Sequence, residues 1–365
     1  FTAFGQGVVA ALIQVGGLGV TSVGAGLIIA AGKRVGIKSR LLIKEALNVD
    51  NYKGLVKLVK AVLLMTLCFE CAGAILSFIV FIQDYPPVHA LGISIFHSIA
   101  AFNNSGFDIL GGLRNLIPYQ TDVLLNMTPC FLIIFGGLGF LVILDILKHR
   151  NFRKLSLHSK VVIVTTIVLL TVGTLLLKAT ENITWMGAFF HSVSARTAGF
   201  STYAIGDFTN AGLFVLIMLM FIGASPGSTG GGIKTSTFFV LFQSIRSMFS
   251  KRHVGAFRRS ISAQNVSKAY MITILSLTVV CVATLLMCVL EPECTFVQLL
   301  FEVVSLRYGG IVNGNYPEPL LGWQAGDYPG YVHRSPGSHD AAYHVDQSSG
   351  TQYTLYGRKY CNRLK

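Results

Sequence analysis

Long apolar segments alternate with short polar connections over most of this chain. Six of them are long enough to cross a bilayer, which takes roughly 20 apolar residues: 7–31, 55–82, 122–147, 161–180, 209–247 and 269–290. Three shorter, partly polar segments lie at 88–101, 184–195 and 295–305. Apolar runs too short to span are more often re-entrant or interfacial. The pattern predicts an all-α membrane protein that combines full spans with re-entrant helices.

Basic residues gather in alternate connections between these segments. Clusters of Lys and Arg fall at 33–60, 148–160 and 246–268. The other two connections, 83–121 and 181–208, contain only Arg114 and Arg196. Because positive connections stay in the cytoplasm, the three clusters are predicted to be cytoplasmic and the re-entrant segments to enter from outside. The net charge of +13 follows from this topology, so no nucleic acid partner is expected.

Composition agrees with a membrane protein. Hydrophobic residues make up 52% of the chain and charged residues 12%, whereas soluble domains carry about 25% charged residues. Mean hydropathy is +0.62, so we expect the lipid bilayer to surround the apolar segments. The chain opens at Phe1 without a charged region before the first apolar run, so no signal peptide is expected and the natural start is expected upstream.

Two sequence patterns recur along the chain. The string QVGGLGV at 14–20 returns as IFGGLGF at 134–140, and IFHSIAAFNNSGF at 95–107 returns as FFHSVSARTAGFS at 189–201. Each repeat unit is predicted to contain a span, a re-entrant helix, a glycine-centred loop and a second span. Internal repeats around a central pathway are common in transporters. The predicted divisions are 1–54 (second span of unit 1 and its cytoplasmic connection), 55–160 (unit 2), 161–267 (unit 3), 268–305 (start of unit 4) and 306–365 (a tail).

The loop after each re-entrant helix is a candidate cation filter. Its glycine can adopt backbone angles that aim successive carbonyls the same way, and such carbonyls replace the hydration shell of a cation. The partly negative end of the preceding helix also favours a cation. The candidate filter residues are Asn104, Ser105, Gly106, Phe107, Thr197, Ala198, Gly199 and Phe200.

The filter assignment has a simpler alternative. Gly106 and Gly199 could be helix-ending glycines in ordinary external loops, although the repetition favours a filter. A single glycine in each loop is also weaker than the doubled glycine of the TVGYG sequence in potassium channels. Strong potassium selectivity therefore does not follow from these residues alone.

A glycine-rich segment at 223–235 interrupts the apolar run at 209–247. Glycine and proline break a helix there, while Ser and Thr can satisfy the freed backbone groups. We interpret the segment as a flexible gate below the filter. A phosphate-binding loop is disfavoured because Ile233 separates Gly232 from Lys234. The candidate gate residues are Ser225, Pro226, Gly227, Ser228, Thr229, Gly230, Gly231, Gly232 and Lys234.

The span at 55–82 contains two further features. Glu70 is an intramembrane acid, and such a residue is expensive to bury and usually functional; a structural hydrogen bond to a neighbouring helix is an equally good interpretation. Cys68 and Cys71 form a CxxC, which we interpret as packing residues rather than as a redox or zinc site. No metal site is expected beyond the transported ion.

The strings QVGGLGV, FHSIAAFNNSGFD, FHSVSARTAGFST and GASPGSTGGGIKTSTF resemble the Trk/Ktr/HKT superfamily of cation transporters, and within it the bacterial KtrB-type subunits, over about residues 1–305. The resemblance implies four pseudo-symmetric units around one pore, with Gly106 and Gly199 in the second and third filter strands and the loop at 223–235 as the gate. It implies inward potassium transport across the bacterial plasma membrane, in some members with sodium dependence, and no cofactor. It also implies a homodimer and a cytosolic ring subunit that binds nucleotides.

The tail departs from the family pattern. Residues 306–365 are polar and rich in Tyr, Gly, His and Arg, and this composition is typical of disorder. We expect the tail to be a translated frameshift, because plausible codons for 307–317 read one base later give GTVGLSTGIT, which resembles the fourth filter of the family. A chain without that filter and the last span is expected to transport poorly.

Two other classes of function remain open. A membrane-embedded protease or acyltransferase would use His97 or His191 as its base, but both recur at the same place in the repeats, whereas a catalytic site is usually single. A membrane scaffold without transport is the third possibility, and potassium flux would separate the three.

Overall fold

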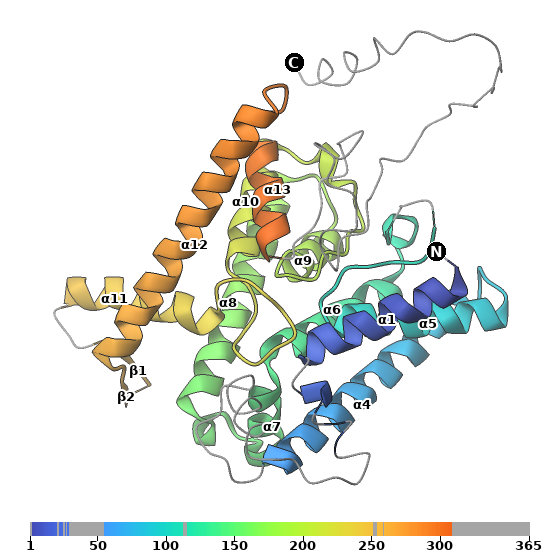
Figure 1. Cartoon of the computed structure of the whole chain (residues 1–365), viewed down its shortest axis with the longest axis horizontal. Helices are drawn as coiled ribbons and strands as arrows, with labels where there is room; N and C mark the ends of the chain where they lie inside the picture. The colour runs from blue at the N-terminus through green and yellow to red at the C-terminus, as the bar shows by residue number, and fades with distance from the viewer. Residues whose placement is uncertain are drawn as a thin grey trace.

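The computed structural model describes residues 2–19, 22–24, 26, 28, 55–111, 115–250, 254–257 and 259–308. The predicted cytoplasmic cluster at 33–60 lies mostly outside the described residues. Arg114 and the tail beyond residue 308, which was predicted to be disordered and frameshifted, lie wholly outside them. The described chain is built almost entirely of helices (Figure 1).

The first two repeat units supply α1 and four further helices. Helix α1 (Ala3–Leu18) packs against α5. Unit 2 consists of α4 (Leu55–Phe81), α5 (Pro87–Phe102), α6 (Val123–Leu138) and α7 (Phe140–His149). The short helix α5 packs against both α4 and α6 (Figure 1). It starts with a proline in its first turn, a position where the missing amide hydrogen costs nothing.

Unit 3 repeats this order, and unit 4 begins it again. Unit 3 contains α8 (Leu157–Thr180), α9 (Trp185–Ser194), α10 (Asn210–Phe221) and α11 (Thr235–Ser250). Unit 4 contributes α12 (Ala263–Leu290) and α13 (Phe296–Tyr308), and α13 packs against α10 and α12. The boundary expected at Leu306 therefore falls inside a helix. Short elements complete the described chain: η1 (Ile117–Tyr119), η2 (Phe152–Lys154), η3 (Ile205–Asp207) and an antiparallel pair, β1 (Gly255–Ala256) and β2 (Arg259–Ser260).

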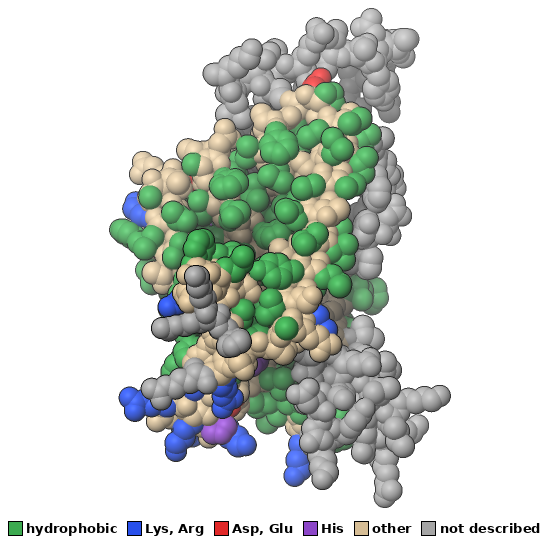
Figure 2. All heavy atoms as spheres, turned by 90° about the vertical axis from the view of Figure 1, so that its left-hand side faces the viewer, with side chains coloured by type: hydrophobic (Ala, Val, Ile, Leu, Met, Phe, Trp, Pro, Cys, Tyr) green, Lys and Arg blue, Asp and Glu red, His purple; other side chains and the backbone are tan. Residues whose placement is uncertain are grey.

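Helices α4, α8 and α12 are long and apolar enough to cross a membrane. Their surfaces carry many exposed large apolar side chains, including Leu64, Ile75, Leu175 and Leu286. In water such surfaces would be unfavourable, whereas lipid accommodates them. Figure 2 shows a broad area of hydrophobic side chains above a lower end where most Lys and Arg side chains gather.

The single span predicted at 122–147 is broken. Helices α6 and α7 meet at an angle of 94°, and Gly139 between them has φ +92°. A methyl group on Gly139 would lie 2.7 Å from Ser225 Oγ and 2.8 Å from the Pro226 carbonyl oxygen. The bend thus occurs where the glycine-rich loop of unit 3 docks against unit 2, and only glycine suits both the backbone angle and the close approach.

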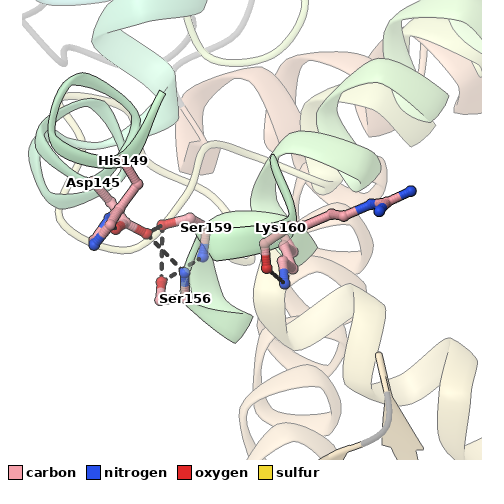
Figure 3. Close-up of polar contacts among 6 residues, drawn as sticks. Asp145, His149, Ser156, Ser159 and Lys160 are labelled. Atoms are coloured by element: carbon pink, nitrogen blue, oxygen red, sulfur yellow. Dashed lines mark hydrogen bonds and ion pairs between the residues drawn. The ribbon is translucent and has the colours of Figure 1, made fainter. Parts of the chain in front are cut away.

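The basic connection between α7 and α8 is held by a carboxylate (Figure 3). Asp145 on α7 accepts hydrogen bonds from the Ser156 amide (2.9 Å) and from Ser159 Oγ (2.5 Å), and it pairs with His149 Nδ1 (2.8 Å). Ser156 is also the N-cap of α8, since its hydroxyl accepts from the Ser159 amide. This cluster fixes the start of α8 and therefore the junction of units 2 and 3.

Candidate ion-conducting site

The predicted second filter segment follows the end of α5 directly. Asn104 and Gly106 both have left-handed backbone angles, φ +53° and +69°. The Ser105 amide donates to the Ala100 carbonyl (3.0 Å), which fastens the segment to the last turn of α5. The segment therefore turns back at the partly negative end of a helix, which is a favourable place for a cation.

The predicted third filter segment has the same backbone pattern after α9. Thr197 and Gly199 have φ +80° and +86°, and the Gly199 amide donates to the Ser194 carbonyl at 3.2 Å. A positive φ is uncommon for any residue with a side chain and is strained for a β-branched one. In both repeats the left-handed residues are the glycine and the residue two positions before it. The two repeats therefore share one backbone conformation at this point.

The two filter segments lie against each other. A methyl group on Gly106 would collide with the Ala198 carbonyl oxygen and would come within 2.8 Å of Gly199 Cα. Thr197, Ala198 and Phe200 are buried. The structure thus brings together the predicted filter residues of both repeats, and only glycine fits at the closest point.

The glycine-rich loop between α10 and α11 docks on the bend of unit 2. Its Ser225 amide donates to the Gly137 carbonyl (3.0 Å), and its Gly227 carbonyl accepts from the Phe140 amide (3.0 Å). Ser225 Oγ also donates to the Leu138 carbonyl. These bonds satisfy backbone groups that the break between α6 and α7 leaves free.

The loop also closes on itself. The Ala224 amide donates to the Gly231 carbonyl (3.1 Å), and the Gly223 amide donates to the Ile233 carbonyl (3.0 Å). Lys234 reaches back so that its Nζ donates to the Gly230 carbonyl (2.8 Å). The predicted gate residues therefore form one compact loop whose two ends are paired.

The tip of this loop touches the second filter segment through Thr229. Its hydroxyl accepts from Asn104 Nδ2 (2.9 Å) and donates to the Phe102 carbonyl (3.0 Å). Its amide donates to the Gly136 carbonyl (3.2 Å). Any movement of the tip away from this segment must therefore break the bonds to Phe102 at the end of α5 and to Asn104.

The third filter segment meets the same loop one residue further on. A methyl group on Gly230 would lie 2.5 Å from Thr197 Oγ1 and 2.5 Å from Ala224 Cβ. The loop can pass this close to Thr197 only because position 230 lacks a side chain. The sequence places these residues in separate motifs, and their contact is visible only in the structure.

Glu70 lies behind the second filter segment. Its carboxylate accepts from Gln14 Nε2 on α1 (3.1 Å) and from Asn103 Nδ2 at the end of α5 (3.0 Å). Sequence reasoning named Glu70 but missed both partners. The signal that was available is the place of Gln14 in the repeated QVGGLGV string and of Asn103 at the entry to the filter segment.

The two candidate catalytic histidines are buried, His97 on α5 and His191 on α9. His191 Nδ1 lies 2.9 Å from the Gly187 carbonyl and its Nε2 lies 3.2 Å from Ser201 Oγ. Ser201 donates its hydroxyl hydrogen to the Tyr203 carbonyl instead of to the imidazole. His97 packs edge-on against Phe200, with ring centroids 5.2 Å apart. Neither arrangement presents an activated nucleophile to a substrate.

The remaining candidates occupy simple positions. Arg196, predicted in an external connection, is buried with 7% of its surface exposed. Cys68 and Cys71 are exposed on α4, where they face the surface that lipid would cover. On the connection between α5 and α6, the Tyr119 hydroxyl donates to Asp84 (2.8 Å). Burial, and secondly this carboxylate, raise the pKa of Tyr119 above its usual value.

Comparison with known proteins bears on this geometry. A family model described as "TrkH: Cation transport protein" matches residues 2–309. The Ktr system potassium uptake protein B of Bacillus subtilis (strain 168) is 34% identical over 333 residues, which cover 87% of this chain and 74% of that protein. The protein of the same name from Vibrio alginolyticus is 35% identical over 320 residues, covering 84% and 70%.

A third relative and a solved structure extend the comparison. The potassium/sodium uptake protein NtpJ of Enterococcus hirae is 35% identical over 334 residues, covering 87% of this chain and 73% of its own. The crystal structure of the potassium transporter TrkH from Vibrio parahaemolyticus matches with a TM-score of 0.55 at 19% identity. That match covers 74% of this chain and 59% of the TrkH chain, and it shows a shared fold.

Proposed function

Since the chain belongs to the TrkH family of cation transport proteins, we propose that it carries potassium ions across the bacterial plasma membrane. Potassium is the ion named for each of the relatives described above. The chain spans 70–74% of those relatives, so we make this proposal for the full-length protein that contains these residues.

The observation that carries the proposal is the pair of matching filter segments. Two segments from different repeats lie in contact, each after the end of a short helix and each with left-handed residues at the same two positions. A cation that passes between backbone carbonyls exchanges its water for them, and two helix ends then add a favourable field. The filter is therefore assigned to residues 104–107 and 197–200, and the units to 55–160 and 161–267.

The loop at 223–235 is proposed to be the gate. It hydrogen bonds to the second filter segment through Thr229 and passes against the third at Gly230. Its glycine content lets it adopt more than one backbone conformation. When it lies as the structure shows, its tip sits beside the filter; when it moves away, the bonds through Thr229 break.

Coupling and assembly are proposed on the resemblance. Sodium is the candidate coupling ion, since one relative is named a potassium/sodium uptake protein. A homodimer and a cytosolic nucleotide-binding ring are the expected partners. Sodium-dependent uptake, the mass of the purified protein and co-purification with a ring subunit would each test one of these points.

Uptake measurements test the proposed function directly. The full-length protein is produced in bacteria that lack their other potassium uptake systems, and growth and ⁸⁶Rb⁺ or potassium uptake are followed at low external potassium. We expect uptake above that of the empty vector. A purified protein that gives neither potassium flux in proteoliposomes nor potassium-dependent thermal stabilisation would overturn the proposal.

A further inference from the structure

Three polar side chains from three helices meet behind the second filter segment. Gln14 comes from α1, Glu70 from α4 and Asn103 from the end of α5, and we call them the polar triad. Gln14 Nε2 donates to Glu70 Oε2 (3.1 Å), and Asn103 Nδ2 lies 3.0 Å from Glu70 Oε1 and 2.9 Å from Gln14 Oε1. The triad therefore joins unit 1 to unit 2 at the entry to a filter segment.

The carboxylate of Glu70 is bound by protein side chains on both of its oxygens. Each of its two oxygens accepts a bond from an amide group, and 8% of the residue is exposed. A carboxylate in a membrane interior is expensive unless hydrogen bonds satisfy it, so its retention indicates a specific use. Its two partners indicate that this use is to hold Asn103, and the ion need not touch it.

Asn103 is fixed tightly on its other side. A methyl group on Gly17 of α1 would collide with Asn103 Oδ1, so α1 packs flush against this side chain. The next residue, Asn104, has a left-handed backbone and bonds to the gate loop. The position of Asn103 therefore decides where the filter segment begins and at which angle.

Unit 3 shows what stands at the matching positions. Ser98 Oγ donates to the Glu70 carbonyl (2.6 Å), and its repeat counterpart Ser192 donates to the Leu170 carbonyl (3.0 Å). Leu170 is therefore the structural counterpart of Glu70. Counted back from the glycines Gly106 and Gly199, Asn103 corresponds to Arg196; counted on from Ser98 and Ser192 it corresponds to Thr197, because the unit 2 segment is one residue longer.

The two filter segments are therefore supported differently. The carboxylate of Glu70 in unit 2 is replaced by the apolar side chain of Leu170 in unit 3. The buried Arg196 has no hydrogen-bond partner for its Nε within the described residues. Only the second segment, among those described, is tied to a carboxylate.

We propose that Glu70 is a positioning residue for ion selectivity, and that it acts through Asn103 on the second filter segment. This inference rests on the proposed function. Holding Asn103 keeps the carbonyls of the following residues at the spacing that suits potassium, and loosening it lets the segment relax around a smaller ion. The third segment reaches its conformation without such a tie.

A double-mutant cycle tests the route of action. Glu70→Ala, Asn103→Ala and the double variant are made in the full-length protein, and potassium and sodium fluxes are measured in proteoliposomes. We expect each single change to lower the potassium-to-sodium flux ratio by about tenfold, comparable to the loss of a hydrogen bond to a charged group. The double variant should be no worse than either single one, because both changes cut the same connection.

Different outcomes would overturn the proposal. An unchanged ratio in Glu70→Ala would show that the carboxylate does not influence selectivity. An additive loss of about a hundredfold in the double variant would show that Glu70 acts on the ion independently of Asn103. Glu70→Gln, which keeps the size and one acceptor oxygen, should retain more of the ratio than Glu70→Ala; an equal loss would favour a direct effect of charge.

Controls separate this inference from other failures. Leu170→Ala alters the matching position of unit 3 and should leave the ratio unchanged, although it creates a small cavity. Gel filtration identifies any variant that does not fold, and if Glu70→Ala fails, Glu70→Gln takes its place in the cycle. If the unmodified protein moves no potassium, the proposed function fails; if it does and the cycle shows no effect, only the present inference fails.

Discussion

Replacing Thr229 with valine should open the proposed gate. Valine has nearly the shape of threonine but no hydroxyl, so the change removes the bond from Asn104 Nδ2 (2.9 Å) and the bond to the Phe102 carbonyl (3.0 Å). The backbone bond from residue 229 to the Gly136 carbonyl remains. The closed conformation of the loop therefore loses two hydrogen bonds. The open conformation loses none, because in it the Asn104 amide and the Phe102 carbonyl are hydrated.

The size of the effect follows from these two bonds. A hydrogen bond contributes about 0.5–1.5 kcal/mol net, so two contribute about 1–3 kcal/mol. Each 1.4 kcal/mol corresponds to about a tenfold change in an equilibrium. We therefore expect the ratio of closed to open loops to fall by roughly tenfold to a hundredfold, and flux to rise wherever opening limits it.

Flux assays on matched variants measure this effect. Thr229→Val should raise initial potassium flux in proteoliposomes at equal protein density, and Thr229→Ser, which keeps the hydroxyl, should resemble the unmodified protein. Ser228→Ala is the neighbouring control, because that hydroxyl bonds only to the Ser225 carbonyl inside the loop (2.6 Å). Equal flux in Thr229→Val and Thr229→Ser would refute the idea that these bonds hold the gate closed.

Four further predictions concern the filter, the gate, the topology and the fold. Gly199→Ser should weaken the preference for potassium over sodium, because a side chain at φ +86° strains the backbone. If the affinities for potassium and sodium are the same in the variant as in the unmodified protein, the filter assignment is contradicted. Deleting residues 225–231 should raise flux, whereas a well-expressed deletion without flux would make the loop structural. In a protein without its native cysteines, Gln83→Cys should react with an impermeant thiol reagent applied outside cells, and Lys154→Cys should not; the reverse result would invert the orientation. Asp145→Ala removes three polar contacts and should destabilise the protein by about 2 kcal/mol, measured as a lower Tm, while Lys160→Ala loses one exposed bond and should change the Tm little.

The spans could be predicted because they depend on local pattern. Helices α4, α8 and α12 each follow a continuous apolar run, and lipid imposes that pattern on any spanning helix. The filter assignment was predicted from repetition, since the two glycines stand at equivalent places, and it stays a prediction. Family membership, confirmed by the match over residues 2–309, follows from strings that are long and unusual.

Features that depend on distant contacts could not be predicted. The bend at Gly139 looks like part of a continuous apolar run, and only the docking of Ser225 and Pro226 explains it. Glu70 and Asn103 are 33 residues apart on different helices, so no local pattern pairs them. Arg196 was counted with the external charges, yet tertiary packing buries it.

The unequal support of the two proposed filter segments has a consequence for how the proposed pore can change over generations. In a channel assembled from identical subunits, one substitution in the gene alters every strand of the filter at once. Here Asn103 and Arg196 are encoded by separate codons of one gene. A substitution at either residue therefore changes one filter segment and leaves the other intact. Ion preference can therefore be adjusted in small, separately inherited steps. A filter segment that keeps its conformation without a carboxylate tolerates substitutions that the other segment does not.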